Sequence, residues 1–280
     1  MNTARQLTDL IKNKARNLGV DAQLLLKRYF MEQMLSRIAQ SEYKENFILK
    51  GGLLISSLIG LSSRTTQDID VSVVNKKLSI EEIKQVMMNV CSIDLKDNIK
   101  YELADINEIR EEFEYPGVRL SFKVYMDKIK DSFKIDITTG DTITPKETSY
   151  GYKLLLDDKE IDIYSYPIET IIAEKIESIL SKSILGTRMR DYYDIYMLEK
   201  LFCDRINKEN QKEALLNTCA KRNTENILNN PDEIIFNIEN NLEQQNLWKN
   251  YASKNIYVGE VTFEDTIKSV RQVLKSISVL

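Results

Sequence analysis

The chain has 280 residues, of which 42% are hydrophobic, with 39 Lys and Arg against 43 Asp and Glu and a formal net charge of −4. This length and hydrophobic content are enough for one large domain or two modest ones and exclude a disordered chain. The negative net charge argues against a protein that coats nucleic acid non-specifically. There is no histidine, so catalytic triads that use histidine and metal centres that bind through histidine are excluded. General base catalysis must come from carboxylates, lysine, tyrosine or a metal-bound water.

The first ninety residues predict N-terminal helices followed by the start of an α/β region. Apolar residues at helical spacing predict helices within residues 4–45. A short buried strand, a helix, a second strand and a further helix are predicted next. Their positions are 47–49 for the first strand, 53–60 for the helix after it, from 68 for the second strand and 79–90 for the last helix. Ser79 and Glu82 have the spacing of a capping box at the start of that last helix.

The character of the sequence changes near residue 165. Three more strands are predicted at 99–106, 117–126 and 133–138, which together with the preceding elements indicate an α/β core with a mixed sheet. After Pro167, which suits a helix start, helical periodicity continues to the end of the chain. We therefore predict a core domain over residues 1–165 and a helical domain over 166–280.

Three carboxylates fall on predicted strands, next to apolar residues that point the other way. Asp68 and Asp70 are two residues apart in an alternating run, so both point away from the apolar face. Asp136 repeats the pattern in the strand at 133–138. At a separation of about 7 Å, two carboxylates repel by about 2 kcal/mol at an effective dielectric near 20. A divalent cation would reverse the sign of this interaction, so the carboxylates are candidate metal ligands.

A glycine pair precedes these carboxylates. Gly51 and Gly52 follow Lys50 at the predicted start of a helix. Glycine lets backbone N–H groups approach an anion closely, and the helix start adds the positive end of a dipole. The pair is therefore a candidate site for the phosphates of a nucleotide.

The order strand, Gly-Gly, helix, Asp-x-Asp and later carboxylate resembles the DNA-polymerase-β-like nucleotidyltransferase superfamily over about residues 47 to 138. In that superfamily the carboxylates hold two Mg²⁺ ions for in-line transfer of a nucleotidyl group from an NTP. A single Asp-x-Asp is usually only a solvated strand face or a turn, so the ordered combination carries the resemblance.

Two predicted C-terminal helices carry charged residues where the pattern calls for apolar ones. Lys175 occupies a position in the apolar stripe of the helix that starts at Ile168, and Asp191 and Asp194 extend an apolar face of the next helix. Lys175 could instead reach outward along the edge of its stripe. Charges on an inward face are costly unless they are paired. Arg188, Arg190 and Lys175 are the candidate partners of the two aspartates.

With these helices included, the chain resembles the AbiEii/AbiGii toxin family, the nucleotidyltransferase-like component of bacterial abortive-infection and type IV toxin–antitoxin systems. Its motifs are Gly-Gly/Ser with Arg-x-Thr-x-Asp-Ile-Asp, a later Asp strand, a helix with Glu-Lys, and Arg-x-Lys-Asp-x-x-Asp. The matching residues are Arg64, Thr66, Asp68, Asp70, Asp136, Lys175, Asp191 and Asp194. Arg190 replaces the more usual lysine before Asp191 and keeps the charge.

The resemblance implies a polymerase-β-like core with N-terminal helices and a C-terminal helical region. It implies a Mg²⁺-dependent nucleotidyltransferase toxin, with GTP and CTP as candidate donors, an RNA acceptor such as tRNA, and a separately encoded antitoxin in a phage-defence system. Asp68, Asp70 and Asp136 would hold metal, with Asp136 as the alternative general base. Lys175 would neutralise phosphate charge, and Asp191 would orient it or contact nucleotide. The nucleotide-binding set would be Lys50, Gly51, Gly52, Arg64, Thr66 and Asp194.

Two other functions remain open on the sequence. In the first, the same nucleotide- and metal-binding residues transfer the nucleotidyl group to a protein hydroxyl. In the second, the chain is an interaction protein that keeps the fold but has no catalytic activity. The presence of every carboxylate of the motifs argues against the second alternative.

Membrane and disulfide chemistry are not indicated. No apolar run approaches the roughly 18 to 20 residues of a membrane span, and the N-terminal region lacks the apolar core of a signal peptide. We therefore expect a cytoplasmic protein without a membrane partner. Cys91, Cys203 and Cys219 are odd in number and lack ligand-type spacing, so they are interpreted most simply as small buried side chains.

Overall fold

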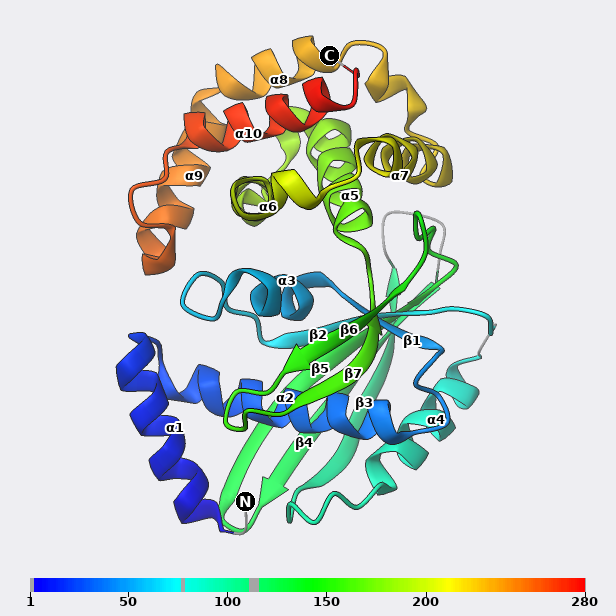
Figure 1. The fold of residues 1–280 in the computed structure, drawn as a ribbon, viewed down its shortest axis with the longest axis vertical. Coiled ribbons are helices and arrows are strands. Elements are labelled where there is room, and N and C mark those ends of the chain that lie inside the picture. The colour runs from blue at the N-terminus through cyan, green and yellow to red at the C-terminus, as the bar shows by residue number, and fades with distance from the viewer. Residues whose placement is uncertain (1–2, 77–78, 111–115, 280) are drawn as a thin grey trace. The chain divides into compact units, whose positions relative to one another are not determined.

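A computed structural model describes residues 3–76, 79–110 and 116–279. The chain folds into two compact units. The first comprises Met1–Asp141 with Thr148–Ser165, and the second comprises Thr142–Glu147 with Tyr166–Leu280. The first unit contains the sheet, and the second is built from helices (Figure 1).

The first unit is organised around a seven-stranded mixed sheet in the order β3-β4-β5-β2-β1-β7-β6. Strands β2 and β5 pair in parallel, as do β1 and β7, while the other neighbours are antiparallel. The strands are β1 Phe47–Lys50, β2 Asp68–Val73, β3 Lys100–Arg110, β4 Pro116–Met126, β5 Ile129–Thr139, β6 Thr148–Lys153 and β7 Glu160–Ser165. The helices of this unit are α1 Ala4–Leu18, α2 Ala22–Gln40, α3 Gly51–Ile59 and α4 Ile80–Ser92.

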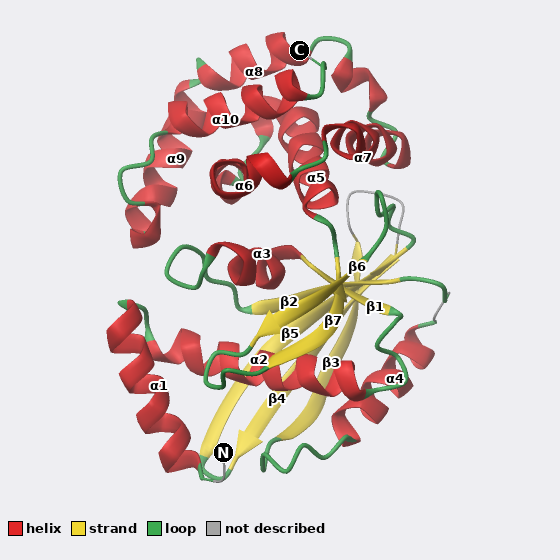
Figure 2. Cartoon of the chain, in the orientation of Figure 1, coloured by secondary structure: helices red, strands yellow, loops and turns green. Residues whose placement is uncertain are grey.

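Helices α2 and α4 cover one face of the sheet (Figure 2). Lys27 of α2 binds Asp131 of β5 at 2.7 Å, so the odd-numbered residues of β5 face this helix. Among them Ile135 and Ile137 are fully buried. Asp136 therefore points to the opposite face of the sheet, which places it away from the apolar core.

The second unit is helical, and its core is formed by the apolar faces of its helices. The contacts of α5 are mainly with α7 and α6, and α10 packs on α6. The α-helices are α5 Ile168–Lys182, α6 Met189–Phe202, α7 Lys208–Lys221, α8 Pro231–Glu239, α9 Leu242–Lys254 and α10 Phe263–Ser276. Pro167 is the N-cap residue of α5. The helix therefore starts next to this proline, as the sequence predicted.

The α/β class and mixed sheet predicted from the sequence are confirmed. The capping box of Ser79 and Glu82 is formed at the start of α4. Two strands, β6 and β7, were not predicted. Each has six residues, and in β6 only Tyr152 is buried, so the apolar alternation that marks a strand is weak there. The division into a core domain over residues 1–165 and a helical domain over 166–280 stays a prediction.

The structure also bears on the three cysteines and on membrane-spanning helices. Cys219 is buried, whereas Cys91 is partly exposed and Cys203 is exposed, so the interpretation of all three cysteines as buried side chains is wrong. Among the described residues, no helix is long and apolar enough to cross a membrane.

Candidate active site

Four charged residues form a row across four neighbouring strands. Lys50 on β1 lies opposite Asp70 on β2, Asp70 lies opposite Asp136 on β5, and Asp136 lies opposite Arg119 on β4. Residues directly opposite each other in a sheet have their side chains on the same face. The row therefore places two carboxylates side by side, with a cation on each flank.

The glycine pair lies against the first carboxylate strand. A Cβ atom on Gly51 would lie 2.0 Å from Oδ2 of Asp70, far inside the distance that two non-bonded atoms allow. The backbone N–H of Gly52 donates to the same oxygen at 3.2 Å. A Cβ atom on Gly52 would lie 2.7 Å from Oγ1 of Thr66. Both glycines are thus needed for the close approach of α3 to the segment that carries Asp68 and Asp70.

The backbone of Gly51 has φ of 64°, in the left-handed region that favours glycine. Position 51 therefore combines two requirements, a positive φ and the absence of a Cβ atom beside Asp70. These requirements explain locally why the sequence has glycine where β1 ends and α3 begins.

Asp68 and Asp70 point to the same face of β2, as their spacing predicted. Ile69 and Val71, which alternate with them, are buried on the other face. Oδ1 of Asp68 accepts a hydrogen bond of 2.5 Å from Thr66. Burial, and then the charge of Asp68, raise the pKa of Asp70 to about 6, with a smaller contribution from Asp136. The site thus concentrates negative charge that a proton or a cation would stabilise.

The two basic residues predicted to lie near a triphosphate are both engaged within the protein. Nζ of Lys50 binds Oδ2 of Asp141 at 2.6 Å. Burial works against the charge of Asp141, but Lys50 and the hydroxyl of Thr138 outweigh it and lower the pKa of Asp141 to about 2. Arg64 is 2% exposed and donates to the carbonyl of Thr65 at 2.6 Å. It supports the turn beside Gly52 rather than extending into solvent.

Asp136 is held by Arg119 in a two-point interaction. Nε donates to Oδ1 at 2.7 Å, and Nη2 donates to Oδ2 at 2.5 Å. Among the residues that the structure describes, no three acidic or cysteine side chains are arranged to hold a metal ion together. The carboxylates of Asp70 and Asp136 are nevertheless hard oxygen donors on one face of neighbouring strands, a donor set that suits Mg²⁺. The residues therefore fit a divalent cation once Asp136 is released from Arg119.

A second charged cluster lies in the helical unit. Nζ of Lys175 on α5 binds Asp191 at 2.6 Å and Asp194 at 2.8 Å, both on α6. The side chains of Lys175 and Asp191 are 13% and 14% exposed, and that of Asp194 is fully buried. Burial works against the charge of Lys175, but Asp191 and then Asp194 outweigh it and raise its pKa. Lys175 therefore pairs inward, whereas Arg188 and Arg190 are exposed.

The predicted site residues are thus distributed over both units. The first unit brings together Lys50, Gly51, Gly52, Arg64, Thr66, Asp68, Asp70 and Asp136, and the second brings together Lys175, Asp191 and Asp194. Sequence reasoning missed Arg119 and Asp141. Arg119 stands in a strand that was predicted correctly, but its relation to Asp136 depends on the register of β4 and β5.

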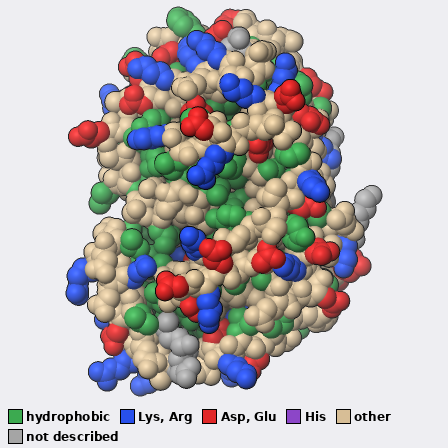
Figure 3. All heavy atoms as spheres, viewed as in Figure 1, with side chains coloured by type: hydrophobic (Ala, Val, Ile, Leu, Met, Phe, Trp, Pro, Cys, Tyr) green, Lys and Arg blue, Asp and Glu red, His purple; other side chains and the backbone are tan. Residues whose placement is uncertain are grey.

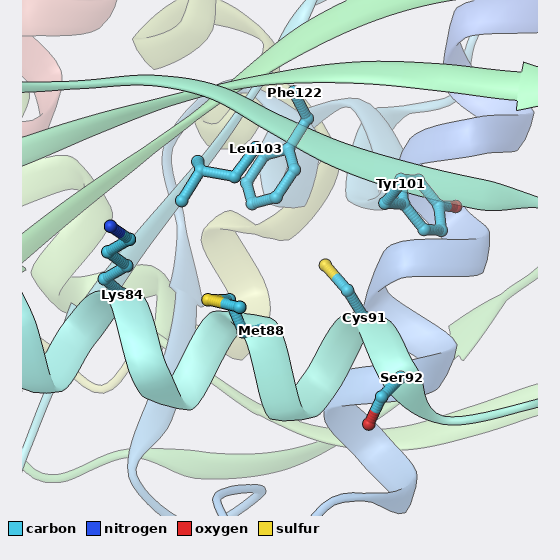
Figure 4. Close-up of a pocket in the computed structure, with 7 residues that line it drawn as sticks. All are labelled: Lys84, Met88, Cys91, Ser92, Tyr101, Leu103 and Phe122. Carbon is cyan, nitrogen blue, oxygen red and sulfur yellow. The ribbon is translucent and has the colours of Figure 1, made fainter.

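A pocket of about 450 Å³ lies elsewhere in the first unit, between α4 and the strands β3 and β4 (Figure 4). Met88 and Cys91 of α4 point toward Leu103 and Phe122 of the sheet. Phe122 is three residues from Arg119 on β4, so the two side chains point to opposite faces. The pocket is therefore separate from the charged row.

The fold is that of a solved protein described as a nucleotidyltransferase. Two solved structures share the fold, each at 16% sequence identity over 92% of this chain. One, described as a proposed nucleotidyltransferase from H. pylori, has a TM-score of 0.50 and 98% of its own chain covered. The other, JHP933 from Helicobacter pylori, has a TM-score of 0.51 and 94% of its chain covered. None of the curated proteins matches the chain.

The sequence profile of the nucleotidyl transferase AbiEii toxin family, of type IV toxin–antitoxin systems, matches residues 33–275. The chain belongs to this family. The match includes both charged clusters, so the family resemblance stated from the sequence motifs is confirmed.

Proposed function

We propose that this toxin-family nucleotidyltransferase transfers a nucleotidyl group from an NTP to an RNA acceptor, with tRNA as the favoured acceptor, and that it uses Mg²⁺. The observation that carries the proposal is the placement of Asp70 opposite Asp136, with the Gly51–Gly52 turn packed against Asp70. This places candidate metal ligands beside a candidate phosphate-binding turn. GTP and CTP are the proposed donors.

The residues of the first unit have distinct proposed roles. Asp68 and Asp70 hold the metal, and the backbone at Gly51 and Gly52 receives the triphosphate. Asp136 either completes the metal site or accepts the proton of the attacking hydroxyl. Mg²⁺, when bound, offsets phosphate charge and aligns the donor with the acceptor. Lys50 and Arg64 support this turn and, with Thr66, belong to the proposed nucleotide-binding set.

The helical unit supplies the remaining proposed roles. Lys175 neutralises charge on the phosphates as pyrophosphate departs, and Asp191, at 2.6 Å from Lys175, orients its ammonium group. Asp194 anchors the same lysine from a fully buried position and is assigned to nucleotide binding. A separately encoded antitoxin and a cytoplasmic, abortive-infection role are also part of the proposal.

The acceptor has to be found by transfer chemistry rather than by surface charge. On the face seen in Figure 3, basic and acidic side chains are interspersed. The test is to incubate the purified protein with each α-labelled NTP and Mg²⁺, with total cellular RNA in one arm and RNase-treated lysate in the other. Label in RNA supports the proposal. Label in protein would replace RNA with a protein hydroxyl, and label in neither would contradict nucleotidyl transfer.

A further inference from the structure

Arg119 has no assigned role, yet it is in direct contact with a carboxylate of the charged row. Its guanidinium binds both oxygens of Asp136, at 2.7 and 2.5 Å. The side chain of Arg119 is 39% exposed, and that of Asp136 is 15% exposed. The guanidinium side of the pair is therefore accessible to a ligand, whereas Asp136 is largely covered.

Stability does not explain this pair. Ion pairs with an exposed partner typically contribute little to stability. The neighbouring strands β4 and β5 are already held by a continuous register from Val118 to Met126. The sheet would form without the side-chain contact, so the position of the guanidinium has another consequence.

That consequence is a conflict with metal binding. While Asp136 accepts two hydrogen bonds from Arg119, a cation approaching the same oxygens meets a fixed positive charge. A guanidinium keeps its charge at any ordinary pH, so this conflict is permanent while the contact lasts. The guanidinium must therefore move before Asp136 can ligate a cation.

A triphosphate offers the guanidinium an alternative partner. Arginine binds phosphate oxygens with the same two-point geometry that it uses for carboxylates. A nucleotide at the Gly51–Gly52 turn would bring phosphates to Asp70, whose strand is adjacent to that of Asp136. Exchange of Arg119 from Asp136 to phosphate would free the carboxylate as the nucleotide arrives.

We propose that Arg119 is a positioning residue that couples cation binding to nucleotide binding: it holds Asp136 before a nucleotide binds and moves to the triphosphate when a cation takes its place. The inference rests on the proposed function. Its consequence is that a cation alone binds weakly and that the nucleotide strengthens cation binding, with the reciprocal effect required by linkage.

The test measures binding of Mn²⁺, as a spectroscopic substitute for Mg²⁺, by electron paramagnetic resonance. Wild-type protein, Arg119→Gln and Lys123→Gln are titrated with and without a non-hydrolysable α,β-methylene triphosphate of each nucleoside. Lys123 is the control because it lies on the same strand and face, is exposed and pairs with Glu102. Melting temperatures of the three proteins check the fold.

Arg119→Gln should bind Mn²⁺ alone about tenfold more tightly than the wild type, a difference of about 1.4 kcal/mol. The factor by which nucleotide strengthens Mn²⁺ binding should fall about tenfold in the same variant and stay unchanged in Lys123→Gln. Loss of a simple phosphate contact would weaken nucleotide binding equally with and without the cation and leave this factor unchanged.

An unchanged coupling factor in a folded Arg119→Gln protein would overturn the inference while the proposed function stands. Wild-type protein that binds no Mn²⁺ with any of the nucleotides would instead overturn the proposed function, and the inference with it.

Discussion

Asp70 lies directly opposite Asp136 in the parallel pair of β2 and β5. Because neighbouring strands are about 4.8 Å apart, this register keeps two carboxylates close together on one face of the sheet. Lys50 and Arg119, on the outer neighbours of these strands, flank the pair with positive charge. The arrangement balances the acidic centre in the absence of a ligand and gives it a specific dependence on pH.

Replacement of Asp70 by asparagine should stabilise the metal-free protein at neutral pH. The pKa of Asp70 is raised to about 6, so its protonated form contributes stability that is fully present below the unfolded value near 3.8 and is lost as the pH rises through 6. Asparagine mimics the protonated form. We expect Asp70→Asn to raise the free energy of unfolding by about 1 to 2 kcal/mol at pH 7.5 and to leave it unchanged near pH 4. Urea unfolding in the presence of EDTA measures both values.

The matched comparison for this prediction is Asp136→Asn. Asp136 is paired with Arg119, so its loss should give no gain at pH 7.5 and a cost of about 0 to 1 kcal/mol. Equal effects of the two substitutions, or a gain for Asp70→Asn that persists at pH 4, would contradict the charge crowding described for β2 and β5.

Replacement of Gly51 by alanine should damage the site more than the same change at Gly19. Both glycines have similar positive φ angles, 64° and 66°, but an added Cβ meets Asp70 at position 51 and nothing within 4 Å at position 19. Gly19→Ala should cost about 1 to 2 kcal/mol from backbone strain alone. Gly51→Ala should cost more and abolish transfer. Similar stability and transfer in the two variants would show that Gly51 has no special packing role.

Lys175→Met should destabilise the protein by about 3 kcal/mol, because it removes the cation shared by Asp191 and the fully buried Asp194. Transfer should also be lost at a temperature where circular dichroism shows the variant folded. Lys268→Met is the control, since its pair with Glu264 is exposed and should contribute less than about 1 kcal/mol. Undiminished transfer by folded Lys175→Met would limit Lys175 to a structural role.

The sequence predicted the parts of the site that depend on local pattern. The alternation around Asp68 and Asp70 was enough to assign both to one face of their strand, because side-chain direction in a strand follows from spacing alone. Asp136 repeats the pattern in a second strand, and the register of the two strands brings it beside Asp70. The charged positions of Lys175, Asp191 and Asp194 within apolar faces also indicated an internal pairing.

The other contacts of the candidate site depend on the register between strands that are distant in sequence. Nothing local to Arg119 indicates that it lies opposite Asp136, and nothing local to Asp141 indicates a contact with Lys50. Cross-strand pairing is set by the packing of the whole sheet, so these partners became visible only in the folded protein. Strands β6 and β7 are similar cases, since their place at the edge next to β1 is a property of the sheet.

Nucleotide binding should require a divalent cation and favour triphosphates. Asp68, Asp70 and Asp136 repel an anionic ligand unless Mg²⁺ offsets their charge. At a hundred times its dissociation constant, an NTP should raise the stability by about 2.7 kcal/mol and shift the melting temperature upward. A nucleoside monophosphate should give a much smaller shift, and EDTA should remove the NTP effect. Equal shifts for mono- and triphosphates, or shifts indifferent to EDTA, would contradict the phosphate and metal site.

The most direct measurement of the central claim is transfer of α-labelled nucleotide to total cellular RNA by the wild type, Asp68→Ala and Asp70→Ala. Circular dichroism and melting curves establish that each variant is folded. The account predicts Mg²⁺-dependent labelling of RNA by the wild type and a loss of at least about a thousandfold in each variant. It also predicts that neither variant arrests growth when it is expressed. Near wild-type transfer by either folded variant would contradict the assignment of these carboxylates as the catalytic centre.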